Sequence, residues 1–309
     1  MTMIPKVFHF VFGLKPQTEP FHLSHYMAIA SCIEVNRPER VYFHYEHLPY
    51  GEWWDRIKDS LVLHPIQQDE SMAAYDYKDP SLEQYRYAHL SDISRLEMLL
   101  EYGGVYADID TMFVRPIPEE LYRHPCVMGH EKVDLNVSAA REAGGSLCNA
   151  LIMAEPGSRF IQYWLDSIMQ EFDGSWSAHS TFLPYRLSRS FPELVHVEPE
   201  SSFFHLDWSR EGIRRLFHQQ VELPENVYSL HLWSHLWWNK ERNDFTYFHA
   251  GRLTPHFIAH GSSTYSALGR PFLPQDEVYA RSVYQREVWR NRVENLALFF
   301  RRIQRAWHD

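Results

Sequence analysis

The chain has 309 residues, 45% of them hydrophobic and 23% charged, and a formal net charge of −10 at pH 7. This composition supports a large apolar core and excludes a disordered or fibrous protein. The acidic balance also argues against a nucleic-acid partner, because binding phosphates needs a basic surface.

The cysteines and the start of the chain bear on the compartment. Cys32, Cys126 and Cys148 are too far apart for a zinc ribbon and form no evident disulfide framework. The opening MTMIPKVFHFVFG lacks the charged head and cleavage site of a secretory signal, and no run of 18 apolar residues occurs. We therefore expect a cytoplasmic protein, either free or peripheral on a membrane surface.

The first hundred residues alternate between strand and helix patterns. Aromatic and β-branched runs predict strands over Val7–Phe12, Arg40–Tyr45 and Leu61–Ile66, and near-helical apolar spacing predicts a helix over Phe21–Asn36. This alternation predicts βαβ units and a mostly parallel α/β sheet. Ligands of such sheets bind at the carboxyl ends of the strands.

Further elements follow to the end of the chain. The patterns predict a helix over Tyr87–Glu101, strands over Val105–Asp110, Asn149–Ala154 and Val227–Leu232, and helices over Ser158–Phe172 and Glu277–Trp307. The last helix is rich in arginine and amphipathic. We predict a catalytic domain over residues 1–240 and a C-terminal extension over 241–309 that ends in this basic helix.

An acidic pair follows the twin glycines Gly103 and Gly104. Asp108 and Asp110 are two residues apart, so they share one side of a strand or meet at its end. Paired carboxylates bind Mg²⁺ or Mn²⁺, and such an ion neutralises a departing diphosphate. Asp92 and Arg95 share a polar helix face, for which the simplest interpretation is a surface ion pair.

These residues form a recognisable pattern. The run SDISR at 91–95 followed by EYGGVYADID at 101–110 resembles the sugar-binding DXD region of the family 32 glycosyltransferases, which include enzymes of polysaccharide biosynthesis and share this signature with clostridial glucosylating toxins. The opening Ile4–Phe10 is similar to the family's first strand, and VYSLHLWSHLWW at 227–238 is similar to its closing segment. The resemblance spans about residues 4 to 238.

The resemblance implies a GT-A fold, a Rossmann-like mixed sheet flanked by helices, here with a helical C-terminal extension. It further implies a nucleotide-sugar donor, Mn²⁺ or Mg²⁺, and retention of anomeric configuration. Carried over by position, Asp110 ligates the metal, and Asp108 contacts the donor sugar and ribose or a metal-bound water. Asp92 and Arg95 hold the sugar hydroxyls and the diphosphate.

The resemblance also indicates donor contacts around this centre. Phe10, Val11 and Phe12 fall where the family holds the nucleobase, with Phe12 in place of a stacking tryptophan. Tyr106 either contacts the diphosphate or ribose or is a core residue. His231, at the end of the closing strand, either completes the metal shell or is structural.

Polar residues elsewhere are further candidates for the cleft. Asn149 precedes an apolar strand and is expected to face the sugar. His179 and Ser180 open a helix, where Ser180 is either a helix cap or a sugar contact. Trp233 and Ser234 are candidate diphosphate contacts in a loop that closes over the donor.

We therefore expect transfer of a hexose-type sugar, from a UDP-sugar first and a GDP-sugar second, to a saccharide, glycolipid or protein acceptor. No nucleophile is evident, which favours front-face substitution over a covalent intermediate. Two alternatives stay open: a phosphatase of the haloacid dehalogenase type, although Met112 stands where that class places Thr or Val, and a non-catalytic sugar-binding protein.

The C-terminal helix has two interpretations. Its arginines and apolar residues suit contact with an anionic membrane surface, or the helix packs on the core. The residues expected to face lipid are Trp289, Leu296, Leu298, Phe299 and Phe300.

Overall fold

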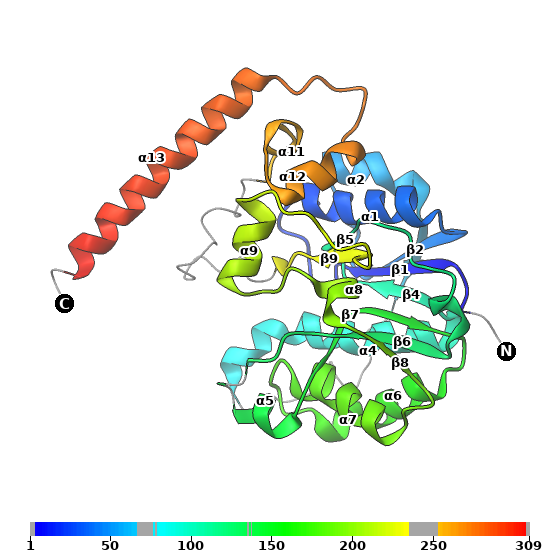
Figure 1. Ribbon diagram of the computed structural model, residues 1–309. Helices are drawn as coiled ribbons and strands as arrows, with labels where there is room; N and C mark the ends of the chain where they lie inside the picture. Colours follow the sequence, from blue (N-terminus) through cyan, green and yellow to red (C-terminus); the bar gives the residue numbers. More distant parts are fainter. Residues whose placement is uncertain are drawn as a thin grey trace. The chain divides into compact units, whose positions relative to one another are not determined.

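The chain is described by a computed structural model that covers residues 4–66, 77, 79–134, 136, 138–234 and 253–306 (Figure 1). It divides into two compact units. The first comprises Met1–Asp207 and Leu223–His231, and the second comprises Trp208–Glu222 and Leu232–Asp309. The domain boundary near residue 240 stays a prediction.

The first unit is built on a seven-stranded sheet with the order β3-β2-β1-β4-β7-β6-β8. Its strands are β1 (Val7–Phe12), β2 (Arg40–Tyr45), β3 (Val62–Pro65), β4 (Gly104–Ala107), β6 (Cys126–His130), β7 (Leu147–Ala154) and β8 (His196–Glu198). Neighbouring strands pair in parallel except at β7, which is antiparallel to both β4 and β6. This mixed sheet with flanking helices confirms the predicted α/β fold.

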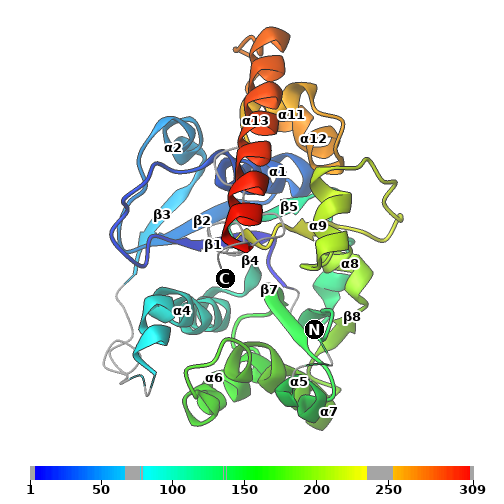
Figure 2. The same ribbon diagram turned by 90° about the vertical axis from the view of Figure 1, so that its left-hand side faces the viewer.

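Helices cover both faces of the sheet. Figures 1 and 2 show α1 and α2 on one face, and α4, α6 and α7 on the other. The helices of this unit are α1 (Leu23–Asn36), α2 (Glu52–Ile57), α4 (Arg86–Tyr102), α5 (Ser138–Ala143), α6 (Arg159–Glu171), α7 (Leu183–Ser190) and α8 (Glu200–Phe204). Short helical turns are η1 (Lys58–Ser60), η2 (Pro80–Tyr85), η3 (Leu121–Arg123) and the π-helical η4 (Ala178–Phe182).

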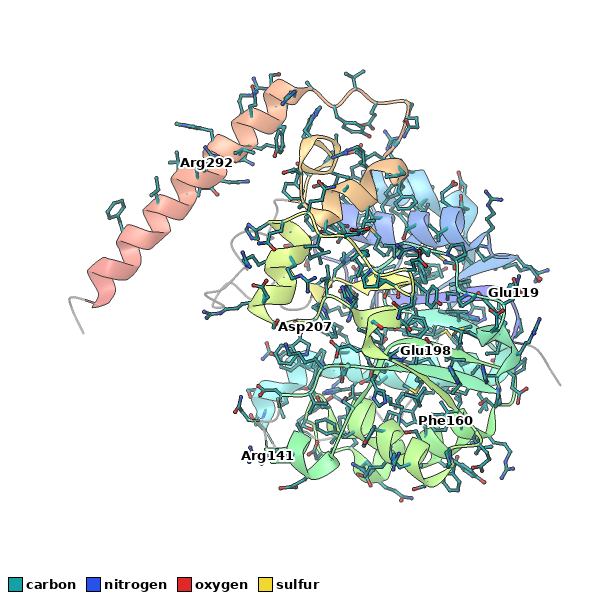
Figure 3. The ribbon with its side chains drawn as sticks, viewed as in Figure 1. Glu119, Arg141, Phe160, Glu198, Asp207 and Arg292 are labelled. Atoms are coloured by element: carbon teal, nitrogen blue, oxygen red, sulfur yellow. The ribbon has the colours of Figure 1, made fainter. Side chains whose placement is uncertain are left out.

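The core between α4, α6 and the sheet follows from helical periodicity. In α6, Phe160, Ile161, Trp164 and Ile168 recur on one side of the helix, and all four are buried. They pack with apolar residues of α4 and of β7 in one cluster, and Figure 3 shows Phe160 among these side chains. This packing anchors α4, which carries Asp92 and Arg95, against the sheet.

The twin glycines set the geometry of the strand that leads to the acidic pair. Gly103 and Gly104 have φ angles of 64° and 107°, which other residues rarely adopt, and a Cβ on Gly104 would lie 2.6 Å from the carbonyl oxygen of Val7. The predicted strand over Val105–Asp110 was too long at its end, because β4 stops at Ala107 and the acidic pair lies in the turn beyond it.

After this turn the chain forms β5 (Thr111–Phe113), which pairs antiparallel with β9 (Ser229–His231). Thr111 lies opposite His231 in this two-stranded sheet. A segment more than a hundred residues later in the sequence is thereby brought beside the acidic turn.

The second unit is helical in its described part. It contains α9 (Arg210–Phe217), α11 (Pro255–His260), α12 (Thr264–Gly269), the turn η6 (Arg270–Phe272) and α13 (Arg281–Ala306). Thr264 begins α12 and its hydroxyl oxygen lies 2.7 Å from the carbonyl oxygen of Arg215, which ties α12 to α9. Within the described residues, every helix is too short or too polar to span a bilayer.

Candidate active site

Two carboxylates and an imidazole meet at the ends of β4 and β9. His231 Nε2 lies 3.0 Å from Asp110 Oδ1 and 3.7 Å from Asp108 Oδ2. One ligand atom from each of the three residues falls within 4.8 Å of the others. Oxygen ligands of this kind suit Mg²⁺ or Mn²⁺, and a neutral imidazole is also a ligand for Mn²⁺-like ions.

The electrostatics of this cluster fit a cation. Burial raises the pKa of Asp108, and the neighbouring Asp110 raises it further against the opposing effects of Arg95 and His231. Burial alone would lower the pKa of His231, but the two carboxylates raise it more, so that its net pKa lies above the ordinary value. The cluster therefore favours an added positive charge, which a divalent metal would supply in place of a proton.

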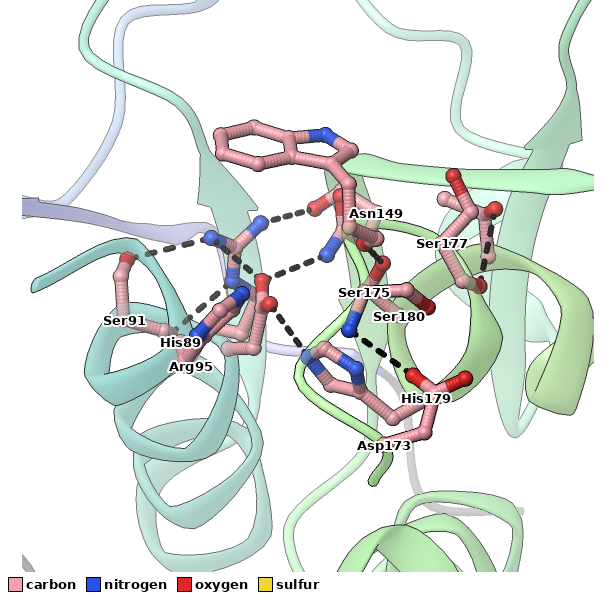
Figure 4. A network of polar contacts seen from close by, with 12 residues as sticks. His89, Ser91, Arg95, Asn149, Asp173, Ser175, Ser177, His179 and Ser180 are labelled. Carbon is pink, nitrogen blue, oxygen red and sulfur yellow. Dashed lines mark hydrogen bonds and ion pairs between the residues drawn. The ribbon is translucent and has the colours of Figure 1, made fainter. Parts of the chain in front are cut away.

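Arg95 occupies the centre of the site and contacts four residues there. Its Nη1 contacts Asp108 Oδ1 at 3.2 Å and the Asn149 carbonyl at 2.8 Å, and its Nη2 contacts Asp92 Oδ1 at 3.0 Å. Nη2 and Nε also donate to the hydroxyl and carbonyl oxygens of Ser91, at 3.1 and 3.0 Å (Figure 4). The guanidinium thus makes four hydrogen bonds and an ion pair with Asp92.

The pair of Asp92 and Arg95 is therefore not the surface ion pair of the simplest interpretation. The side chains of Asp92 and Arg95 are only 10% and 6% exposed. Removing two charges from water is costly unless their hydrogen bonds are satisfied. The local i, i+3 spacing was visible in the sequence, whereas the burial results from the sheet and α6 packing around α4.

Tyr106 supports the acidic pair from β4. Its hydroxyl donates to Asp108 Oδ1 over 2.6 Å, and its ring lies 4.6 Å from the Arg95 guanidinium carbon. The side chain is 1% exposed. Of the two interpretations, diphosphate contact or core residue, the geometry favours a buried residue that holds Asp108 in place.

Asp92 is held from three elements. Its Oδ1 accepts from Arg95 of α4 and, at 2.7 Å, from the side-chain amide of Asn149 in β7. Its Oδ2 lies 2.9 Å from Nε2 of His179 in η4. Burial alone would raise the pKa of Asp92, but Arg95 and His179 lower it more, so that the net pKa lies below its usual value.

The nucleobase candidates lie along β1. Phe10 is fully buried and Val11 is 6% exposed, whereas Phe12 at the strand end is only partly buried. The Phe12 ring lies 5.2 Å from that of Phe21, edge to face, and 4.9 Å from the imidazole of His25. Of these three residues, Phe12 is the one whose side chain is partly exposed.

The predicted diphosphate contacts belong to a different unit. Trp233 and Ser234 follow β9 and fall in the second unit, where Trp233 is buried and has a φ of 55°. Such a left-handed backbone is uncommon for a residue other than glycine. Residues 235–238 of the closing segment lie outside the described residues.

Two contributions to the site were not expected from the sequence. Ser91 supplies two acceptors to Arg95, its hydroxyl and its carbonyl oxygen. The carboxyl of Glu131 accepts a hydrogen bond from Ser146. Burial raises the pKa of Glu131, and His231 is among its electrostatic neighbours. Ser91 lies within the quoted motif, so its position could have indicated a role. Glu131 follows β6 without any local pattern that marks it.

Comparison with known proteins agrees with this geometry. Residues 25–128 match the family model described as "Glycosyltransferase sugar-binding region containing DXD motif". Glucan organizing enzyme 1 of Cryptococcus neoformans is 32% identical over 292 residues, which cover 90% of this chain and 74% of the relative. The chain belongs to this DXD glycosyltransferase family. The resemblance to family 32 glycosyltransferases is thereby confirmed, and the phosphatase alternative is wrong.

Other relatives of this glycosyltransferase are more distant. Human alpha-1,4-N-acetylglucosaminyltransferase is 27% identical over 198 residues, 58% of this chain and 54% of that protein. The glycosyltransferase GlyE of Streptococcus pneumoniae, a solved structure, has a TM-score of 0.45 at 13% identity, and the match covers 76% of this chain and 56% of that one.

Proposed function

We propose that this glycosyltransferase is a retaining, metal-dependent enzyme that moves a hexose-type sugar from a nucleotide sugar to a saccharide, glycolipid or protein acceptor. The observation that carries the proposal is the convergence of Asp108, Asp110 and His231 beside Arg95, which bonds Asp108. A UDP-sugar is the first donor to expect and a GDP-sugar the second. The human relative's name adds N-acetylglucosamine to the sugars worth testing.

Each part of the site has a chemical task in this proposal. Asp108, Asp110 and His231 would hold Mn²⁺ or Mg²⁺, either directly or through water, and the bound ion would supply positive charge for the departing nucleoside diphosphate. Arg95 adds a fixed positive charge next to Asp108. Asp92, which is ionised and accepts hydrogen bonds only, receives sugar hydroxyls at the edge of the network.

The decisive experiment follows donor hydrolysis and thermal shift for a panel of UDP- and GDP-sugars with and without Mn²⁺. A cation and donor that bind only the folded state raise the melting temperature. We expect Asp110→Asn to abolish the Mn²⁺-dependent shift and to lower turnover by at least about 1000-fold, several kcal/mol of charge stabilisation.

A matched control is Asp166→Asn, because Asp166 lies on the exposed side of α6 and bonds only Gln162 among the described residues. It should leave both readouts unchanged. Full turnover by Asp110→Asn would refute the assigned metal site, and inversion at the anomeric carbon of the product, read by NMR, would refute retention.

We also propose that α13 contacts an anionic membrane surface. Trp289, Val293, Leu296 and Phe300 recur at spacings of four, three and four residues, which places them on one side of the helix, and all four are exposed. The helix sequence carries seven arginines and two glutamates, in a chain whose net charge is −10. Its polarity therefore matches an anionic leaflet.

Flotation with vesicles tests the membrane proposal. The full chain should float with vesicles containing anionic phospholipid and not with neutral ones, and a chain ending at residue 276 should float with neither. The side chains of Leu298 and Phe299 lie outside the described residues, so Trp289→Ser and Leu296→Ser are the better single variants. Equal flotation of the truncated and full chains would refute the proposal.

A further inference from the structure

His179 makes an unusual contact at the sugar side of the site. It lies in the π-helical turn η4, far in sequence from α4, and its side chain is fully buried. Its Nε2 is 2.9 Å from Asp92 Oδ2, while Arg95 and Asn149 both bind the other oxygen, Oδ1 (Figure 4). His179 is thus the partner of the Asp92 oxygen that the other two residues do not hold.

The partner of the His179 ring shows which of its nitrogens donates. Asp92 is ionised because its pKa is lowered, so its carboxylate can only accept, and His179 Nε2 must be the donor. In the neutral ring Nδ1 is then an acceptor, and it has no hydrogen-bond partner among the residues that the structure describes. The ring is oriented by packing. Its centroid lies 4.7 Å from that of the Phe172 ring and 5.3 Å from that of the His89 ring.

Packing alone does not account for a histidine here. A buried ring nitrogen without a partner opposes folding, and an apolar ring would fill the same space among Phe172 and His89 without that cost. The polar contact with Asp92 is the only hydrogen bond of the His179 ring within the described residues. The benefit of the histidine therefore lies in what it does to Asp92.

We propose that His179 is a positioning residue for donor-sugar recognition. Bonds to Oδ1 alone would let the Asp92 carboxylate pivot about that atom, whereas the bond from His179 to Oδ2 fixes the second oxygen. The lone pairs of Oδ2 that remain are then directed at one place, where a sugar hydroxyl can donate. This inference rests on the proposed function, in which Asp92 receives the hydroxyls of the donor sugar.

Two variants that differ by one methylene test the proposal. In His179→Gln the amide nitrogen takes the approximate place of Nε2 and can still donate to Asp92. In His179→Asn the amide lies near the place of Nδ1 and falls short of Asp92. Phe172→Leu is the packing control, because Phe172 touches the same ring but does not bond Asp92.

The measurements distinguish recognition of the donor sugar from recognition of the nucleoside diphosphate. We expect His179→Asn to lower kcat/KM for the best nucleotide sugar by about 10- to 100-fold, the usual size of a lost hydrogen bond to a charged group. Affinity for UDP with Mn²⁺ should stay within about twofold, because the proposed function assigns the diphosphate and metal to Asp110 and His231. His179→Gln should recover most of the activity, and Phe172→Leu should remain close to wild type.

The outcomes distinguish this inference from the proposal on which it rests. A wild-type chain that neither binds nor turns over any nucleotide sugar refutes the proposed function and this inference with it. An active wild type whose His179→Asn variant is equally active refutes the inference alone. Equal losses in the Asn, Gln and Phe172→Leu variants, or a matching loss of UDP affinity, show a packing role and also overturn it.

Discussion

The first unit holds two largely buried polar clusters that differ in charge. Across β1, β2 and β3, His9, His44 and His64 form a row in which His9 Nδ1 is 3.0 Å from His44 Nε2, and His44 Nδ1 is 3.2 Å from His64 Nδ1. The row ends on the Gly103 carbonyl, 2.9 Å from His9 Nε2, and on the Tyr102 hydroxyl, 3.4 Å from His64 Nε2.

The histidine row is satisfied by neutral rings. If His9 donates to Gly103 and each following ring donates to the one before it, every ring nitrogen has a partner and no charge is needed. The pKa values agree, because burial lowers the pKa of His9 to about 4 and that of His44 to about 2. A closed, uncharged row of this kind contributes structure and offers nothing to a ligand.

The cluster around Arg95 has the opposite character. Asp92 and Arg95 stay charged, because the pKa of Asp92 is lowered and that of Arg95 is raised. Beside them, where Asp108, Asp110 and His231 converge, the pKa values of Asp108 and His231 are raised, which favours an added cation. Burial is therefore a poor guide to function when taken alone. The informative feature is a buried cluster whose charges are left to be completed by a ligand.

The largest effect should come from breaking the charged cluster at its centre. Arg95→Met removes four hydrogen bonds and the ion pair with Asp92, and leaves the buried Asp92 and the partly buried Asp108 without their shared cation, so we expect the free energy of unfolding to fall by about 3–5 kcal/mol, with activity lost. Urea unfolding measures the loss.

The matched control for this experiment is Arg159→Met, because the Arg159 side chain contacts Tyr163 at the surface of α6. A surface change of this type should alter the unfolding free energy by no more than about 0.5 kcal/mol. Equal stabilities of the two variants would mean that the Arg95 network is not a buried unit.

The neutral row should respond to acid. The pKa of His9 is about 4 in the folded chain, against an ordinary value of 6.5. As the pH falls, this residue is therefore protonated in the unfolded chain before it is protonated in the folded chain. Its contribution to the free energy of unfolding is complete above pH 6.5 and is lost as the pH falls through about 4. The shift corresponds to roughly 3 kcal/mol for His9. Unfolding curves between pH 7.5 and 4.5 should show a steep loss in the wild type.

The variant His9→Gln isolates that contribution from the other buried histidines. Its amide can still donate to the Gly103 carbonyl, but it cannot titrate. We expect it to be less stable than the wild type at pH 7.5 and to lose less on acidification. Parallel pH profiles for the two chains would contradict the neutral-row interpretation, whereas His130→Gln, at an exposed ring, should keep the wild-type slope.

The sequence was sufficient where the determinants are local. Strands β1 and β2 have the predicted bounds, because aromatic runs between turn residues specify them, and α4 ends at the predicted twin glycines. The helical spacing of Asp92 and Arg95 likewise placed both on one side of α4. Each of these features depends on residues that are close together in the sequence.

The rest of the site depends on pairings that no local pattern encodes. His231 reaches the acidic turn because β9 pairs with β5 across more than a hundred residues, although the family resemblance had indicated it. His179 was a candidate for the sugar itself, but the π-helical turn aims it at Asp92 instead. The pairing of β6 with β7 also shifts register between Met128 and Gly129, next to the segment that presents Asn149.

The smallest effect should come from one hydroxyl in each cluster. Tyr106→Phe removes the 2.6 Å bond to Asp108, which Arg95 still holds, so we expect about 1 kcal/mol less stability and turnover lower by roughly 10-fold. Tyr102→Phe removes the 3.4 Å contact with His64 and should leave turnover unchanged, because its hydroxyl contacts the neutral row and Glu101 rather than the Arg95 cluster. Steady-state kinetics with the preferred donor compares the two. If Tyr102→Phe lowered turnover as much as Tyr106→Phe, the separation between a structural cluster and a functional one would fail.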